Sequence, residues 1–374
     1  MRAAAETRLA PQWGALAAAG LLAVVLAAAV SAQGARVAAL GAIGIALGAA
    51  LWLSAFGFTS AYRRLLEGHG THGVRAQLIM LAAATVLFAP VLAQGEWFGR
   101  EVAGAIAPAG LQVAAGAFLF GVGMQLAGGC GSGSLYAAGG GQLRMLVALA
   151  TFIGGSFWAS LHTDAWGSLP ALEPLALGEE IGWPAAVAIQ LAALAVLYAL
   201  LGRLPGARAD ASGRRIAGAL ALAGLGLVTL VVAGHPWSIT WAFTLWGAKA
   251  ARALGWDPDS SGFWTGESQR NALDSSVFAD VTSVMDFGLV LGAFAAAGVA
   301  GGFRLRFGPS PRAVAAAALG GLAMGYGARI AYGCNIGAFF SGVASTSLHG
   351  WLWIAAALPG CWVGLKSRRW LSLS

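Results

Sequence analysis

The sequence predicts an all-α polytopic membrane protein with about 9–10 transmembrane spans. Of its 374 residues, 58% are hydrophobic and 10% are charged, whereas soluble domains carry roughly 25% charged residues. Short Arg-rich clusters separate long apolar runs. The three cysteines provide neither a disulfide framework nor a zinc site, which needs about four clustered ligands. These observations exclude a disordered chain, a disulfide-stapled secreted module and an ordinary soluble enzyme.

Apolar runs that could cross a bilayer, which takes about 20 residues, recur along the whole chain. We expect spans at residues 14–32, 35–57, 74–93, 111–128, 144–163, 184–202, 215–233, 284–301, 311–332 and 350–365. The first run also has the features of a signal peptide, because basic residues precede it and Val30-Ser31-Ala32 resembles a cleavage site. A second apolar run follows almost at once, which favours an uncleaved span.

The charged residues alternate between the two ends of the expected spans. Basic residues occupy one set of connections and the tail, at Arg63, Arg64, Arg75, Arg203, Arg208, Arg214, Arg215, Arg304, Arg306, Arg312, Lys366, Arg368 and Arg369. Acidic residues concentrate in the other set, at Glu96, Glu101, Asp164, Glu173, Glu179, Glu180, Asp257, Asp259, Glu267, Asp274 and Asp280. The positive-inside bias predicts that both termini face the cytoplasm. It also accounts for the net charge of +7, so nucleic acid is not an expected partner.

Two stretches of the chain are similar to each other. Residues 121–136 read GVGMQLAGGCGSGSLY and residues 325–340 read GYGARIAYGCNIGAFF. A weaker pair precedes them, FGFTSAYRRL from Phe56 and WSITWAFTLW from Trp237. The first cysteine segment is expected to run from outside to inside and the second from inside to outside. The repeats are therefore predicted to be inverted, a recurring transporter design with its site where the repeats meet near the midplane.

The repeat divides the chain into four parts. Residues 1–34 are an extra N-terminal transmembrane helix or a signal-like segment, 35–183 the first repeat with the Cys130 motif, 184–214 a linking helix and cytoplasmic loop, and 215–374 the second, inverted repeat with the Cys334 motif. The connection at 254–283 is too long for a plain link, and we expect an outer cap there.

Both cysteine motifs interrupt an apolar helix. The first break contains Gly129, Cys130 and Gly131, and the second contains Gly333, Cys334 and Asn335. Backbone groups freed in lipid cost several kcal/mol unless they are buried in protein or line a polar cavity. An apolar stretch of about ten residues follows each break, which predicts a half-helix whose positive N-terminal end points at mid-membrane and suits an anion. Close helix packing through small residues is the alternative explanation of the glycines, but it does not explain matched cysteines.

Other polar residues near the breaks complete the predicted site. Arg329 is an intramembrane cation and a functional candidate by default; pairing with Asp286 or a backbone carbonyl is its alternative role. Gln125 occupies the repeat position of Arg329. Asn335 either donates its amide to an anion or caps the half-helix. A cysteine nucleophile needs a positioned base, and neither motif contains His, Asp or Glu. We therefore expect no catalytic residue, no metal and no cofactor, and interpret Cys361 as core packing.

At these residues the sequence resembles the YeeE/YedE family of bacterial inner-membrane sulfur transporters. The resemblance covers residues 35–365 and rests on GGCGSG from Gly128 and YGCNIGAFFSG from Tyr332, with FTSAYR from Phe58 and WAFTLWGAK from Trp241. It implies an hourglass-like molecule that takes up thiosulfate through a constriction lined by thiols. That role would fall on Cys130 and Cys334. A third cysteine of the family is absent, and Gly57 or a neighbour occupies its place.

The resemblance also implies a partner, a cytoplasmic sulfur carrier of the TusA-like or rhodanese-like kind. Two alternatives remain open at this point. One is a membrane sulfur relay that carries persulfide on Cys130 or Cys334; the other is transport of another sulfur or selenium species. A GxxxxGK[ST] phosphate-binding loop does not occur in the sequence, so the chain itself is not expected to hydrolyse ATP.

Overall fold

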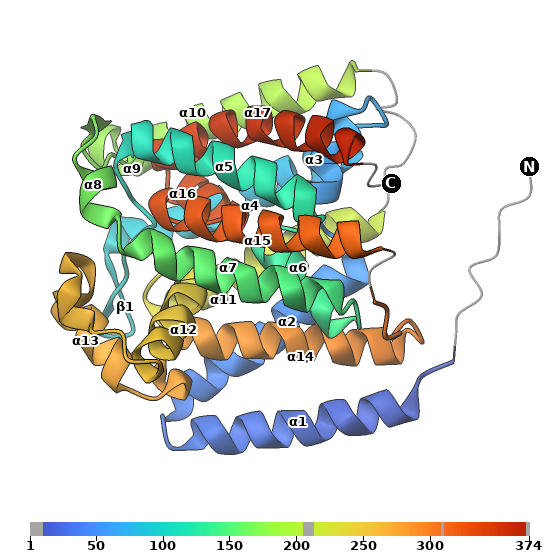
Figure 1. Ribbon diagram of the computed structural model, residues 1–374. Helices are drawn as coiled ribbons and strands as arrows, with labels where there is room; N and C mark the ends of the chain where they lie inside the picture. Colours follow the sequence, from blue (N-terminus) through green and yellow to red (C-terminus); the bar gives the residue numbers. More distant parts are fainter. Residues whose placement is uncertain (1–9, 205–212, 308–309, 372–374) are drawn as a thin grey trace, which may run out of the picture.

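The computed structural model of the protein describes residues 10–204, 213–307 and 310–371. Its long helices run side by side, with both ends of the chain at the same side of the bundle (Figure 1). Within these ranges nine helices are long and apolar enough to cross a membrane, and Arg144–Ser160 is a shorter apolar helix. Each of the ten expected spans corresponds to one of these, which confirms the all-α polytopic fold. Residues 1–9 of the predicted N-terminal segment and Arg208 lie outside the described residues.

The first half of the chain alternates long helices with short ones. Its helices are α1 (Trp13–Ser31), α2 (Ala35–Ser54), α3 (Phe58–Leu66), α4 (His72–Gln94), α5 (Leu111–Ala127), α6 (Gly131–Gly139), α7 (Arg144–Ser160), α8 (Thr163–Gly167) and α9 (Leu177–Ile181). Four two-residue strands pair in the connections, β1 (Glu96–Trp97) with β2 (Arg100–Glu101) and β3 (Ala109–Gly110) with β4 (Ala171–Leu172).

The second half repeats the alternation. Its α-helices are α10 (Trp183–Gly202), α11 (Gly213–Ala233), α12 (Thr240–Ala253), α13 (Glu267–Asp274), α14 (Val281–Val299), α15 (Pro311–Ile330), α16 (Ser341–Ala344) and α17 (Leu348–Trp370). The other helical turns are η1 (Pro258–Ser260), η2 (Gly262–Thr265), η3 (Val277–Ala279) and the π-helix η4 (Asn335–Phe340). The predicted half-helices at both cysteine motifs are therefore present, as α6 and as η4 with α16.

Glycine-lined contacts hold the long helices together. At the α2–α14 contact, a Cβ at Gly44 or Gly48 would strike the backbone of α14, and one at Gly288 or Gly292 would strike the backbone of α2. Close approach through small residues is typical of helix packing in membranes, where lipid tails are as apolar as the side chains. Helix α15 packs in the same way against α5 and α7.

The helix contacts come in matching pairs. Helix α14 packs on α2 and α4 packs on α11, while α15 packs on α7 and α5 packs on α17. This is the pattern that two inverted repeats produce when they interlock. Helix α1 packs on α14 as α10 packs on α4, and Figure 1 shows α1 and α10 at opposite edges of the bundle. The N-terminal helix and the linking helix thus occupy corresponding places.

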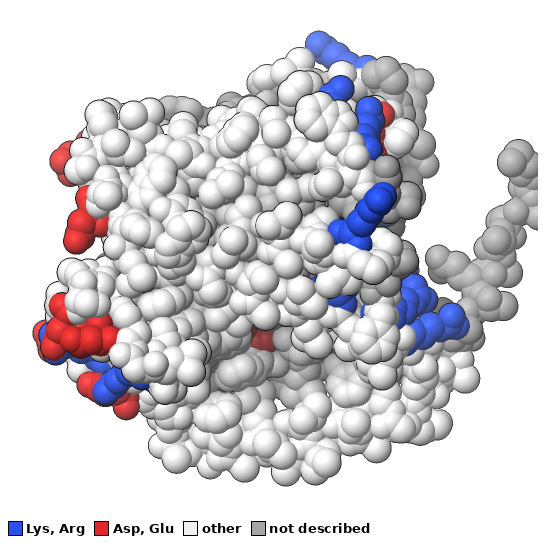
Figure 2. Space-filling model, viewed as in Figure 1, with Lys and Arg blue, Asp and Glu red and all other residues white. Residues whose placement is uncertain are grey.

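Charged side chains gather at the two ends of the bundle. Figure 2 shows Lys and Arg mainly at the end where the termini lie, and Asp and Glu mainly at the opposite end, with a largely uncharged belt between them. Such a belt suits the hydrocarbon core of a bilayer, which is about 30 Å thick. The connection between α12 and α14 lies at the acidic end, where Trp264 is fully buried and Lys249 donates hydrogen bonds to the carbonyls of Leu273 and Ser275 at 2.7 and 2.6 Å.

Candidate substrate-translocation site

The first helix break is built by glycine and capped by a thiol. Helix α5 ends at Ala127, and Gly128 follows in a left-handed conformation with φ 82° that glycine adopts at little cost. Cys130 is the N-cap of α6, and its Sγ accepts a hydrogen bond from the Gly133 N–H at 3.4 Å. The Cys130 side chain is 1% exposed. Its thiol therefore lies at the positive end of a half-helix inside the protein.

The second break has the same construction. Helix α15 ends at Ile330, and Gly333 follows with φ 149°. Cys334 is the N-cap of η4, and its Sγ accepts a hydrogen bond from the Ile336 N–H at 3.4 Å. Asn335 is fully buried and neither atom of its side-chain amide has a partner. Because Cys334 provides the cap, the capping role considered for Asn335 is not the one observed.

The two breaks lie against each other. A Cβ at Gly131 would lie 3.4 Å from Cys334 Sγ and 3.7 Å from Ile239 Cγ2, and one at Gly337 would lie 3.6 Å from Ser238 Oγ. Ile239 is the N-cap residue of α12. From the first repeat, Phe58 at the start of α3 packs its ring 6.5 Å from that of Phe339 on η4.

Four helix N termini, those of α3, α6, α12 and η4, therefore surround one point in the interior. Each contributes free backbone N–H groups and the positive end of a helix dipole.

Buried polar groups without partners surround this point. Thr59 Oγ1, Tyr62 Oη and both amide atoms of Asn335 are buried and make no hydrogen bond. The Thr59 hydroxyl lies close to Cys130, and the Tyr62 hydroxyl lies close to Asn335. Unpartnered buried donors cost about 1–3 kcal/mol each, so such a cluster indicates a bound polar ligand. Thr59 and Tyr62 are site residues that sequence reasoning missed, although both lie in the weaker repeat motif.

Gln125 holds a half-helix in place. Its amide donates to the Thr59 carbonyl at 3.2 Å and accepts from Arg63 Nε at 3.3 Å. Gln125 is fully buried near the C-terminal end of α5. The predicted polar residue is thus beside the thiols, where it positions α3.

Cys361 is fully buried on α17 and packs on α5, since a Cβ at Gly121 would lie 2.9 Å from the Cys361 N atom.

Arg329 points away from the thiols. Its guanidinium carbon lies 4.2 Å from the ring centre of Phe263, which belongs to the connection at the acidic end. Its Nε is buried without a hydrogen-bond partner, and neither Asp286 nor a backbone carbonyl pairs with it in the described part of the chain. Both pairings considered from the sequence are therefore wrong. The structure places Arg329 between the outer connection and the second break, with a cation–π contact as its observed interaction.

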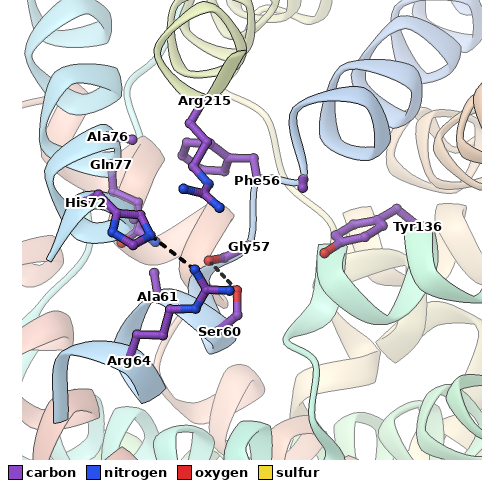
Figure 3. Close-up of a pocket in the computed structure, with 12 residues that line it drawn as sticks. Phe56, Gly57, Ser60, Ala61, Arg64, His72, Ala76, Gln77, Tyr136 and Arg215 are labelled. Carbon is purple, nitrogen blue, oxygen red and sulfur yellow. Dashed lines mark hydrogen bonds between the residues drawn. The ribbon is translucent and has the colours of Figure 1, made fainter. Parts of the chain in front are cut away.

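A cavity of about 240 Å³ leads from the basic end toward the start of α3 (Figure 3). Arg64, His72 and Arg215 line it, and Arg64 Nη1 lies 3.1 Å from His72 Nε2. Gly57 and Tyr136 line it as well. A positively lined cleft raises the local concentration of anions, so this cavity suits an anion that passes between the thiols and the basic end.

Gly57 stands where the resemblance places a third cysteine. A Cβ there would lie 3.1 Å from Ser60 Oγ and 3.3 Å from Tyr136 Oη. Figure 3 shows Ser60 beside Gly57 and the Tyr136 hydroxyl directed toward the same region. Hydroxyl groups, rather than a thiol, therefore provide hydrogen bonding at this level of the molecule. The described residues contain no group of three or more His, Cys, Asp or Glu that could hold a metal.

Broken helices whose N termini meet inside the bundle are characteristic of membrane transporters. The chain belongs to the sulphur-transport family, which it matches over residues 53–363. It is 32% identical to the thiosulfate transporter TsuA of Spirochaeta thermophila over 66% of this chain and 74% of that one. It is 26% identical to TsuA of Escherichia coli (strain K12) over 66% and 71%. The family and these relatives are transporters and not enzymes.

A second group of relatives matches a shorter stretch. The chain is 33% identical to the probable transporter YedE of Escherichia coli (strain K12) over 135 residues, which are 36% of this chain and 33% of that one. The match therefore spans about a third of the length of the YedE relatives. The family membership predicted from the cysteine motifs is confirmed, and the chain is a multi-pass membrane protein.

Proposed function

We propose that the protein takes up thiosulfate, or a closely related sulfur oxyanion, through the paired helix breaks. The observation that carries this proposal is the meeting of the two half-helix N termini at Cys130 and Cys334, among the unpartnered side chains of Thr59, Tyr62 and Asn335. Helix N termini favour a dianion. The names of the TsuA relatives support thiosulfate as its identity.

Neutral thiols suit conduction because they are weak donors. An ion that is bound too tightly would not leave, and permeation requires easy exit. In this proposal the thiols of Cys130 and Cys334, with Asn335 and the backbone at Gly129, Gly131 and Gly333, receive the anion in turn. Gln125 keeps α3 in position, and Arg329 acts nearer the acidic end. The anion then leaves through the cavity lined by Arg64 and Arg215.

The surroundings of the thiols favour permeation over a persulfide relay. A nucleophilic thiolate needs a neighbouring cation or base. The side-chain contacts of Cys130 and Cys334 are to hydroxyl and backbone N–H groups, and Arg329 is directed at Phe263. We therefore propose a permease in the bacterial inner membrane with the C-terminus in the cytoplasm. A TusA-like or rhodanese-like sulfur carrier would dock at the basic end.

The test is growth on thiosulfate as sole sulfur source in a bacterium that lacks its own thiosulfate uptake. We expect rescue by the wild type and by Cys361→Ala, which removes a buried thiol of α17 that caps neither half-helix. We expect loss of rescue with Cys130→Ala and Cys334→Ala at equal membrane levels. Failure of the wild type to rescue would refute thiosulfate uptake. Equal rescue by all four proteins would refute the role of the paired thiols.

A further inference from the structure

Among the residues that the structure describes, a single carboxyl group is buried in the membrane-spanning part of the bundle, outside the site described above. Asp286 lies on α14, is 0% exposed, and neither of its carboxyl oxygens has a hydrogen-bond partner. It lines a groove of about 670 Å³ whose other walls are mostly apolar side chains of α1, α7 and α14. Figure 2 shows acidic atoms at the bottom of a hollow in the uncharged belt, and Asp286 is the acidic residue among those that line this groove.

A carboxylate in such surroundings is unfavourable, because nothing replaces the water that it loses. The neutral acid costs far less, so the group holds a proton unless a cation pairs with it. An ionisable residue within a membrane span is a functional candidate by default.

The elements packed against α14 are α1, α2, α6, α12 and η3. Helix α1 and η3 carry no charged or titratable side chain. Arg36 of α2 donates to the Val232 carbonyl at 2.8 Å. Tyr136 of α6 lines the cavity at the basic end. On α12, Lys249 binds carbonyls of the outer connection, and Arg252 pairs with Asp274 at 2.6 Å. None of these cations pairs with Asp286, whose two carboxyl oxygens have no hydrogen-bond partner among the described residues.

Two polar residues precede Asp286 at the start of α14, on the side of the acidic end of the molecule. Asp280, Ser283 and Asp286 follow one another at intervals of three residues, which places them on one face of α14. Asp280 Oδ2 accepts from Ser283 Oγ at 2.6 Å, and Trp246 Nε1 donates to Ser283 Oγ at 2.8 Å. Asp280 is partly exposed. Asp280 and Ser283 thus lie on α14 between Asp286 and the acidic end.

We propose that Asp286 is a proton-binding site whose occupancy is linked to that of the anion at the paired helix breaks. This inference rests on the proposed function and adds that the transport of the anion is coupled to a proton. Helix α14 packs against α6, whose N-cap is Cys130, so a negative charge on Asp286 opposes an anion at the helix breaks, and the anion binds best when Asp286 is neutral. By reciprocity, a bound dianion makes Asp286 hold its proton more tightly. The proton enters through Asp280 and Ser283 from the acidic end.

The coupling is tested by uptake of radiolabelled thiosulfate at external pH values from about 6 to about 9, the range in which buried carboxyls can ionise. Thiosulfate remains a dianion throughout. We expect uptake by the wild type to fall at least about fivefold as pH rises. Asp286→Asn, which is permanently neutral and has nearly the same shape, should change less than about twofold and retain the high rate. Asp286→Glu should retain the pH dependence.

Asp257→Asn is the matched control, because Asp257 belongs to the outer connection, where its carboxylate accepts only a local hydrogen bond from Asp259 N at 3.0 Å. It should behave as the wild type. Asp280→Asn should slow uptake at high pH without removing the pH dependence. An Asp286→Asn protein whose uptake falls with pH as steeply as that of the wild type would overturn the proposal.

A second measurement does not depend on transport. A buried neutral acid binds its proton more tightly in the native state than in the unfolded state, so the native protein binds more protons and its stability falls as pH rises. The thermal unfolding midpoint of the purified wild type should therefore decrease relative to that of Asp286→Asn between about pH 6 and about pH 9. If the wild type takes up no thiosulfate but shows this relative decrease, the proposed function fails and the proton site stands. A constant difference would refute the proton site.

Discussion

At the residue scale, the centre of the molecule contains more hydrogen-bonding capacity than the chain itself uses. The Tyr62 hydroxyl, the Thr59 hydroxyl and the Asn335 amide are all buried without partners. At each helix break the cysteine sulfur accepts one backbone N–H group, Cys130 that of Gly133 and Cys334 that of Ile336. A folded protein retains such groups where a ligand repays their desolvation.

Tyr62→Phe tests whether one of these hydroxyls serves the anion. The ring remains, so its packing against Phe58 is kept, at 6.3 Å between ring centres. We expect thiosulfate uptake to fall about fivefold, the equivalent of one hydrogen bond worth about 1 kcal/mol. Stability should stay within about 0.5 kcal/mol of the wild type, because no hydrogen bond within the protein is lost. Tyr198→Phe is the control, because Tyr198 lies on α10 at the edge of the bundle. Unchanged uptake in Tyr62→Phe would show that the hydroxyl does not contact the anion.

At the element scale, the sequence predicts the broken helices well because their cause is local. Gly128 and Gly333 adopt positive φ values, and each is followed within two residues by a cysteine that caps the next helix. The direction of a side chain at a helix end depends on tertiary packing, and there prediction from sequence was less successful. Arg329 lies five residues before Cys334 in the sequence, but its contact with Phe263 joins segments 66 residues apart. The positions of Thr59 and Tyr62 also depend on a contact between distant segments, because Gln125 of α5 binds the Thr59 carbonyl of α3.

Gly48→Ala tests the glycine contact between α2 and α14. A methyl group at this position would strike the Leu289 carbonyl and lie 2.9 Å from the Ala293 N atom, so the helices must separate. Overpacking of this kind costs about 1–3 kcal/mol. We expect a lower thermal unfolding midpoint and less folded protein in the membrane. Gly20→Ala on α1 is the matched control, because nothing lies within 4 Å of a Cβ there. Equal midpoints for both variants would mean that the contact does not need glycine.

At the scale of the whole molecule, the charge distribution and the paired helix contacts agree with the predicted inverted arrangement. The sequence treats residues 1–34 as an addition and residues 184–214 as a linker, because neither resembles the other. The contacts of α1 with α14 and of α10 with α4 give the two helices equivalent surroundings. Lipid-facing helices need only apolar surface, so they lose sequence similarity while keeping their place. This is why the prediction found the repeat at the cysteine motifs and not at its outer helices.

The orientation of the bundle in the membrane follows from the positive-inside bias, which predicts the basic end in the cytoplasm. Cysteine labelling can decide it, because the native thiols of Cys130, Cys334 and Cys361 are at most 1% exposed and give little background. Ser260→Cys places a thiol on the exposed connection at the acidic end, and His69→Cys places one at the basic end, where the His69 side chain is 71% exposed.

We expect a membrane-impermeant maleimide to label Ser260→Cys in cells whose inner membrane is intact. It should label His69→Cys only after that membrane is broken. The reverse pattern would show that the acidic end of the bundle faces the cytoplasm. Asp280 would then face the cytoplasm, and the cavity lined by Arg64 and Arg215 would be the entrance for the anion. The protein would in that case be an exporter. The labelling result therefore determines from which side of the membrane the anion and the proton enter.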